Sequence, residues 1–187
     1  MHCPSAHRLR LARRVVRSGG VIAYPTEAVW GLGCDPASRI AVEAILGLKG
    51  RTANKGLILV AADFGQLEPW LLPLGSEPRS RVLATWPGPV TWLLPARRSV
   101  PHWLRGGHST LAVRISDHPV VQALCRTTGH PLVSTSANRS GGRPARSPLD
   151  VHRIFGTNID LMVPGELGNR KLPSEIRDLS GRVLRPG

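Results

Sequence analysis

The stretch LVSTSANRSGG, from Leu132 to Gly142, joins a short apolar run to a dense cluster of polar side chains and glycines. An apolar run of this length, preceded by Gly129 and Pro131, predicts a buried strand. In open α/β sheets, ligands bind beyond the carboxyl ends of the strands. The side chains that can form hydrogen bonds at this end are Ser134, Thr135, Ser136 and Asn138. They suit phosphate oxygens or the edge of a purine, but such residues also form ordinary surface turns, so both interpretations stay open.

Length and charge narrow the class of protein. A chain of 187 residues with 41% hydrophobic content predicts a single domain, residues 1–187, with a sizeable core. The 25 Lys and Arg residues against 12 acidic residues give a formal net charge of +13, which favours nucleic acid or a multiply phosphorylated substrate as partner. The arginines are spread along the chain, so the alternative explanation of the positive charge is a generally Arg-rich composition without a polyanionic partner.

The cysteines and histidines offer no framework for a disulfide or a metal. Cys3, Cys34 and Cys125 are odd in number and widely spaced, which favours a reducing, cytoplasmic location. The seven histidines show no HExxH or comparable spacing, so we expect no metal site built from protein side chains. No apolar run approaches the length of a transmembrane helix, and we expect no membrane contact.

A second candidate loop reads PTEAVWGLG, residues 25–33, after a strand predicted at Val21–Tyr24. It combines a hydroxyl, a carboxylate, an aromatic ring and two glycines, which suits a binding loop. The alternative is that Trp30 anchors the core and Thr26 belongs to a turn.

Three cations follow a predicted helix. The helix starts at the Asp35-Pro36 pair and runs to about Lys49. Lys49, Arg51 and Lys55 lie within seven residues, just before a strand predicted at 57–62. We expect these cations to be exposed, where they could hold a triphosphate or complement the negative end of the helix dipole.

The remaining segments complete an alternation of helices and strands. Arg114 lies within a predicted strand, and a buried arginine usually pairs with a carboxylate, either of the protein or of a substrate. The pattern predicts a three-layer α/β domain with a mixed sheet. The other predicted elements are a helix around 9–17, one or two helices in 64–85 broken around Pro73–Pro78, a strand within 86–96, the strand Thr110–Ile115, a helix from His118-Pro119 to about Thr127, a short helix after Ser147, a strand at Ile159–Val163 and two short strands around Ser180-Gly181.

Five ordered segments carry a resemblance to a known family. They are YPTEAVWGLGCDP, LKGRTANKGLILVAA, WPGPVTWLLPA, LAVRISDHP and PLVSTSANRSGGRP. The chain resembles the YrdC-like threonylcarbamoyl-AMP synthases, and its closing PSEIRD segment is similar to the short bacterial, single-domain members. The resemblance implies a twisted mixed β-sheet flanked by helices and hollowed into a basic concave cleft.

The resemblance also implies an activity. Members of the family are nucleotidyltransferases that form L-threonylcarbamoyladenylate and diphosphate from L-threonine, bicarbonate and ATP, with Mg²⁺. Other proteins transfer the threonylcarbamoyl group to tRNA, and the basic cleft suggests direct contact with tRNA. No protein nucleophile is needed, because the carbamate oxygen attacks the α-phosphorus.

The family motifs K-x-R and S-x-N assign roles to individual residues. By this resemblance Lys49 and Arg51 are catalytic, neutralising the triphosphate and the departing diphosphate. The residues implied to bind ATP are Lys49, Arg51, Thr110, Ser134, Ser136, Asn138 and Arg185. Those implied to bind threonine are Thr26, Arg114 and Ser174.

Two positions depart from the family pattern, and two other functions compete. Val60 stands where longer members carry a histidine, and Trp30 stands where a smaller aromatic is usual, so both bear on the threonine pocket. An RNA-binding module without catalysis would explain the charge, but aromatic residues for base stacking amount to only 4%. A carbamoyl-adenylate synthase would share the ATP motifs, but it would need further domains and zinc-finger cysteines for which we expect no room.

Overall fold

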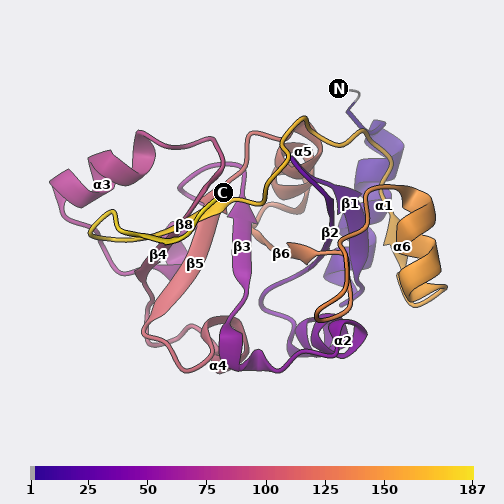
Figure 1. Ribbon diagram of the computed structural model, residues 1–187, viewed down its shortest axis with the longest axis horizontal. Coiled ribbons are helices and arrows are strands. Elements are labelled where there is room, and N and C mark those ends of the chain that lie inside the picture. The colour runs from indigo at the N-terminus through magenta and orange to yellow at the C-terminus, as the bar shows by residue number, and fades with distance from the viewer. Residues whose placement is uncertain (1–2) are drawn as a thin grey trace.

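The computed structural model describes residues 3–187, and the strands in this part of the chain form one mixed sheet (Figure 1). The strand order is β7-β1-β2-β6-β3-β5-β4-β8-β9. The pairs β1–β7, β3–β5 and β4–β8 are parallel, and the other neighbours are antiparallel. The strands are β1 (Ile22–Pro25), β2 (Trp30–Cys34), β3 (Ile58–Ala61), β4 (Val90–Pro95), β5 (Thr110–Ile115), β6 (Leu132–Ser136), β7 (Leu161–Met162), β8 (Glu175–Asp178) and β9 (Val183–Arg185).

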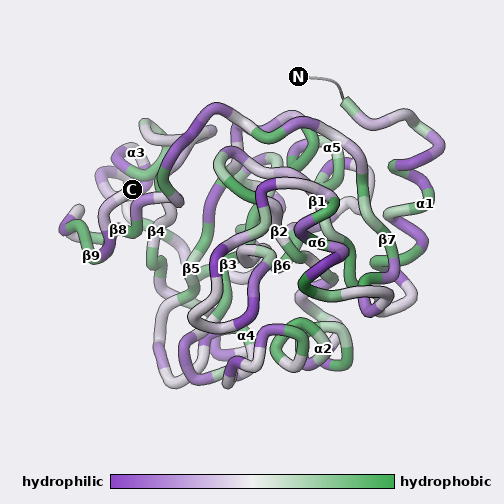
Figure 2. The backbone as a smooth tube through the Cα atoms, turned by 45° about the vertical axis from the view of Figure 1, so that its right-hand side comes forward, coloured by the Kyte–Doolittle hydropathy of each residue, from purple (hydrophilic) through white to green (hydrophobic). Residues whose placement is uncertain are grey.

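Helices cover both faces of the sheet, which confirms the predicted α/β fold (Figure 1). One core contains side chains of α2 and α4, and the other contains side chains of α1 and α5. Along α1 the buried residues Ala12 and Val16 lie four positions apart, on one face of an amphipathic helix whose other positions are largely polar (Figure 2). The helices are α1 (Ala6–Arg17), α2 (Arg39–Lys49), α3 (Ser76–Leu83), α4 (His102–Arg105), α5 (Pro119–Thr128) and α6 (Pro148–Phe155), with short 3₁₀ turns η1 (Ala53–Lys55) and η2 (Glu68–Trp70).

The two-residue period of the strands separates core from pocket. On β5, Leu111, Val113 and Ile115 enter the core under α2 and α4. The alternate residues Thr110, Ala112 and Arg114 face the other way and line a pocket. β3 follows the same rule with Ile58 and Val60. On β6, Ser134 and Ser136 line the pocket, and the intervening Thr135 lines it as well. The pocket therefore occupies the part of this face that α1 and α5 leave open.

The predicted loop at 25–33 was wrong in its second half. Trp30–Cys34 is a strand, β2, which pairs antiparallel with β1 and leaves a turn at residues 26–29. Trp30, Leu32 and Cys34 are buried in the core, so tertiary packing decides the conformation. Gly33 is needed there, because a Cβ atom would lie 2.7 Å from the Tyr24 ring.

The predicted start of α2 at Asp35-Pro36 was also wrong. The helix begins at Arg39, and the Ser38 side chain caps it by accepting a hydrogen bond from the Ala41 N–H at 3.3 Å. Asp35 instead accepts a hydrogen bond from the Ala37 N–H at 2.8 Å and forms a turn. The predicted end was right, because Gly50 follows Lys49 in the left-handed region with φ 59°.

The segment 64–85 forms two short helices, η2 and α3, as predicted, but Pro78 does not interrupt them. It lies in the first turn of α3, where the missing N–H has no partner within the helix to lose. The predicted strand at 159–163 is shorter, since β7 contains only Leu161 and Met162.

Candidate active site

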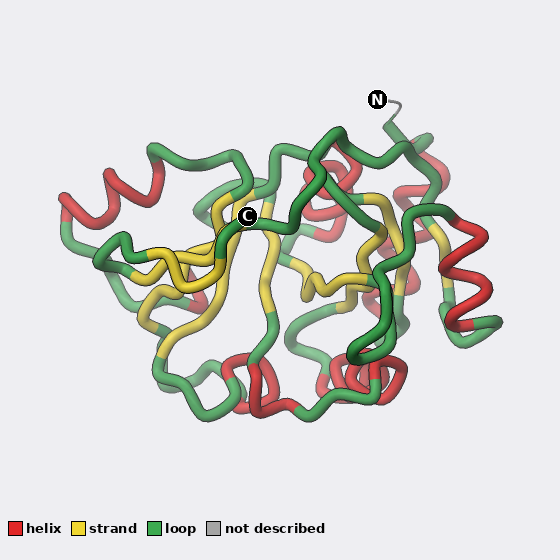
Figure 3. The backbone as a smooth tube through the Cα atoms, viewed as in Figure 1, coloured by secondary structure: helices red, strands yellow, loops and turns green. Residues whose placement is uncertain are grey.

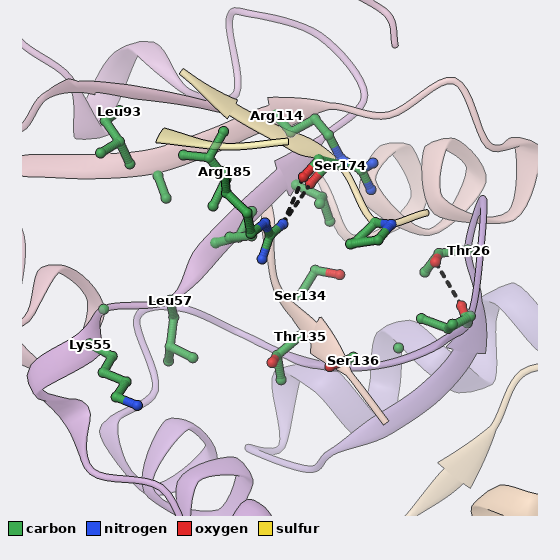
Figure 4. Close-up of a pocket in the computed structure, with 18 of the residues that line it drawn as sticks. Thr26, Lys55, Leu57, Leu93, Arg114, Ser134, Thr135, Ser136, Ser174 and Arg185 are labelled. Carbon is green, nitrogen blue, oxygen red and sulfur yellow. Dashed lines mark hydrogen bonds between the residues drawn. The ribbon is translucent and has the colours of Figure 1, made fainter. Parts of the chain in front are cut away.

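A cavity of about 460 Å³ opens over β3, β5 and β6 on the sheet face described above (Figure 4). Eight of the ten residues assigned by the family motifs line it, and Lys49 and Asn138 do not. Those that line it are Thr26, Arg51, Thr110, Arg114, Ser134, Ser136, Ser174 and Arg185. Val60 and Trp30, the two departures from the family pattern, also line the cavity.

Lys49 is buried, which contradicts the expectation that it is exposed at the end of the helix. Only 4% of its surface is accessible. Its Nζ donates hydrogen bonds to Ser136 O at 2.5 Å, to Asn138 O at 2.9 Å and to Asn138 Oδ1 at 3.2 Å. Burial, with a smaller contribution from the neighbouring Arg51 charge, lowers the pKa of Lys49 to about 8. The ammonium thus fastens the loop that follows β6.

The side chain of Asn138, like that of Lys49, makes hydrogen bonds that hold the loop after β6. Its Oδ1 accepts a hydrogen bond from Ser136 Oγ at 2.6 Å, and its Nδ2 donates to Arg139 O at 2.9 Å and to Gly142 O at 2.8 Å. The loop after β6 is therefore an ordered turn with a buried cation at its centre. The residues of β6 that line the pocket just before this loop are Ser134, Thr135 and Ser136 (Figure 4).

Arg51 and Lys55 supply positive charge at one end of the pocket. Arg51 Nη2 donates to Gly56 O at 2.7 Å, while its buried Nε has no hydrogen-bond partner among residues 3–187. Burial lowers the pKa of Arg51, but a guanidinium stays charged at neutral pH. Lys55 is exposed and forms no ion pair within the described chain, so its ammonium is free to meet an anion (Figure 4).

Arg114 has a protein carboxylate as partner, and the residue is Glu27, which sequence reasoning did not assign. Arg114 Nη2 donates to Glu27 Oε2 at 2.9 Å, and both residues are buried. Ser116 Oγ donates to Glu27 Oε1 at 2.5 Å. Burial alone would raise the pKa of Glu27, but the Arg114 charge and the Ser116 hydrogen bond outweigh it, so the pKa is lowered. The position beside Thr26 in the PTEA segment was the one available signal.

The C-terminal segment forms another wall of the pocket. Arg185 Nη2 donates to Ser174 O at 2.7 Å (Figure 4). The hydroxyls of Ser174 and Thr91 lie 2.8 Å apart. Burial, with a smaller contribution from Arg114, lowers the pKa of Arg185. The connection from β7 to β8 contains neither helix nor strand (Figure 3). It is fastened to the turn at 26–29, because Gly168 N donates to Thr26 O and Arg170 N to Glu27 O, both at 3.0 Å.

The pocket suits an anionic ligand. Among the described residues, Glu27 is the one carboxylate that lines it, against six cations: Arg51, Lys55, Arg105, Arg114, Arg170 and Arg185. Within residues 3–187, no group of three or more His, Cys, Asp or Glu side chains is arranged to hold a metal ion. The same part of the chain contains no helix that is both long and apolar enough to span a bilayer.

The mixed sheet places the chain among the α/β proteins, and its cation-lined pocket is suited to a small anionic ligand. Comparison with known proteins identifies the family within that class. The model of the Sua5/YciO/YrdC family, described as telomere recombination, matches residues 14–187, and the chain belongs to this family.

Close relatives share one name. The threonylcarbamoyl-AMP synthase of Nitrosococcus oceani is 61% identical over 186 residues, which cover 99% of this chain and all of the relative. The threonylcarbamoyl-AMP synthase of Pseudomonas aeruginosa is 52% identical over 183 residues, covering 97% and 98% of the two chains.

Solved structures have the same fold. The chain resembles P. abyssi Sua5 complexed with L-threonine with a TM-score of 0.89 and 34% identity, covering 96% of this chain. It spans only 54% of that longer Sua5 chain. E. coli YciO gives a TM-score of 0.82 at 27% identity, with 97% of this chain and 91% of YciO covered.

Proposed function

We propose that this single-domain chain is a threonylcarbamoyl-AMP synthase, which forms L-threonylcarbamoyladenylate and diphosphate from L-threonine, bicarbonate and ATP. The observation that carries the proposal is that one pocket combines a buried arginine suited to a carboxylate with separate cations and hydroxyls suited to phosphates. Lys55 lies across this pocket from Thr26 and Arg114 (Figure 4). The names of the close relatives support the same activity.

The amino acid binds at the Arg114 end in this proposal. Arg114 Nε is buried and has no hydrogen-bond partner in the described protein, so an incoming carboxylate would satisfy a donor that is otherwise unpaired. Thr26 Oγ1 donates to Val29 O at 2.7 Å, which leaves the oxygen free to accept a hydrogen bond from the hydroxyl of threonine. The Ser174 hydroxyl lies on the same side of the pocket (Figure 4).

The nucleotide binds at the end of the pocket that Arg51 and Lys55 line. Arg51 and Lys55 neutralise the triphosphate, and Ser134 donates a hydrogen bond to the nucleotide. Asn138 Oδ1 takes the proton of Ser136 Oγ, which leaves the Ser136 oxygen free to accept a hydrogen bond from the nucleotide. Thr110 and Arg185 complete the nucleotide contacts, and Arg185, which is hydrogen-bonded to Ser174, lies where the nucleotide meets the amino acid. Lys49 and Asn138 act by holding the loop of Ser136 in place, as their hydrogen bonds suggest.

Magnesium enters as part of the substrate in this scheme. Mg²⁺ prefers oxygen ligands and commonly binds substrate phosphates. The pocket offers one carboxylate among the described residues, Glu27, and both of its oxygens already accept hydrogen bonds. MgATP, with the ion held by phosphate oxygens, fits this set of side chains.

The reaction needs positioning and charge more than a protein nucleophile. The amine of threonine combines with carbon dioxide from bicarbonate, losing a proton to give a carbamate. A carbamate oxygen then forms a bond to the α-phosphorus of ATP, and the bond from that phosphorus to the bridging oxygen breaks, releasing diphosphate. Arg51 and Lys55 offset the charge that develops on the leaving group. Other proteins would pass the threonylcarbamoyl group to tRNA, which the cations around the pocket could also contact.

One assay tests the proposal. The protein is incubated with MgATP, labelled bicarbonate and threonine, and the label is followed into an adenylate while diphosphate is measured. We expect both products, and omission of threonine should abolish them. An RNA-binding module would form neither product, and a carbamoyl-adenylate synthase would form none that depends on threonine.

A further inference from the structure

Glu27 lies in an unexpected place for a carboxylate. It lines a pocket that otherwise carries only cations among the charged groups of the described chain, and it is 5% exposed. A carboxylate here opposes the binding of ATP by charge repulsion. Its presence therefore calls for a role toward another part of the substrates.

Its contacts join the two halves of the amino-acid end. Glu27 belongs to the turn that follows β1, next to Thr26, and its carboxylate reaches Arg114 and Ser116 at the end of β5. Ser116 Oγ in turn accepts a hydrogen bond from His118 N at 3.1 Å. The carboxylate thus fixes the turn that presents Thr26 relative to the strand that presents Arg114.

A role as general base fits the contacts poorly. The ammonium of an amino acid loses its proton to a base of comparable proton affinity. Both oxygens of Glu27 accept hydrogen bonds, and the pKa of the carboxyl is lowered, so it is a weak base. What the geometry favours is a fixed anion that acts on its neighbour.

The orientation of Arg114 is the property that Glu27 controls. One amino group of the guanidinium, Nη2, is held by Glu27, while Nε is buried without a partner in the described chain and the residue lines the pocket. Since the guanidinium is planar, holding one nitrogen restricts the direction of the other N–H groups.

We infer that Glu27 is a positioning residue that holds the Arg114 guanidinium in the orientation that receives the carboxylate of the amino-acid substrate. This inference rests on the proposed function. Glu27 touches Arg114 and not the reacting atoms, so its effect belongs to amino-acid binding and not to the chemical step or to ATP.

Glu27→Gln tests the inference, because glutamine keeps the size and one acceptor but removes the charge. The KM for threonine should rise about 10- to 100-fold, as expected when a charged hydrogen bond is lost. The KM for ATP should stay within about twofold, and kcat at saturating threonine should be retained. Glu68→Gln, which breaks the exposed ion pair between Glu68 of η2 and Arg79 of α3, is the matched control and should leave all three constants unchanged.

A double-mutant cycle separates positioning from a general structural role. If Glu27 acts through Arg114, Glu27→Gln should add little to the threonine KM of the Arg114→Gln enzyme. If Glu27→Gln does not fold, as judged by circular dichroism, Glu27→Asp keeps the charge but shortens the reach. It should still raise the KM for threonine selectively.

The outcomes distinguish the role of Glu27 from the synthase activity itself. Equal increases in KM for ATP and threonine, a fall in kcat alone, or full additivity with Arg114→Gln would overturn the role of Glu27 while the synthase activity stands. A wild-type protein that releases no threonine-dependent diphosphate would overturn the proposed function, and this inference with it.

Discussion

Replacing Lys49 by methionine should destabilise the protein, although cations at helix ends are usually of little consequence for stability. Methionine matches the length of the lysine chain but cannot donate, so Ser136 O and Asn138 O both lose a buried donor. Each unsatisfied acceptor costs roughly 1–3 kcal/mol. Because the variant also avoids burying a charge, we expect a net loss of about 2–4 kcal/mol in the free energy of unfolding.

Urea denaturation followed by circular dichroism measures this loss. Lys55→Met is the matched control, because Lys55 is exposed and has no ion pair in the described chain, and its free energy of unfolding should change by less than about 0.5 kcal/mol. If Lys49→Met were as stable as Lys55→Met, the hydrogen bonds of Lys49 would not hold the loop, and a direct contact of Lys49 with the triphosphate would become the better explanation.

Four further predictions follow from the site. The pKa of Lys49 is 10.5 in the unfolded chain and about 8 in the folded protein, so the unfolded chain binds more protons between these two pH values. The free energy of unfolding of the wild type, relative to that of Lys49→Met, should therefore rise from pH 8 to pH 10.5. A difference between the two proteins that does not change with pH would contradict the burial of the ammonium. Ser136→Ala should weaken ATP binding by roughly 1–3 kcal/mol in a calorimetric titration, and unchanged affinity would show that this hydroxyl does not contact the nucleotide. Thr26→Val should abolish the preference for threonine over valine in diphosphate release, since it removes the polar partner of the threonine hydroxyl; a preserved preference would move the amino-acid pocket elsewhere. Chelation of Mg²⁺ should stop synthesis without changing the melting temperature of the ligand-free protein, and a lowered melting temperature would indicate a structural metal.

Regular elements of the fold were predictable because their sequence signals are local. The strand Thr110–Ile115 and the end of α2 at Lys49 follow from an apolar run and a glycine stop, and both agree with the structure. The strand β2 was missed because Gly31 and Gly33 read as a loop, whereas the small size of Gly33 is what lets the strand pack against Tyr24.

The sequence predicted most of the residues of the site, but not the hydrogen bonds and ion pairs that they form. The motifs named most of the residues that line the pocket, since side chains with this chemistry recur at fixed places in the sequence. They could not show that Lys49 turns inward, because its acceptors lie 87 and 89 residues further along the chain. The Glu27 partner of Arg114, also 87 residues distant, was hidden for the same reason.

The alternation of side chains along β5 limits how the chain can change in length. Insertion or deletion of one residue within Thr110–Ile115 would exchange the two faces beyond that point, sending Arg114 toward the apolar core and a large aliphatic side chain toward the substrates. A change of two residues would preserve the faces and alter only the length of the strand. We therefore expect related enzymes to vary in length in the connections between strands, and to tolerate single-residue gaps within β5 least of all.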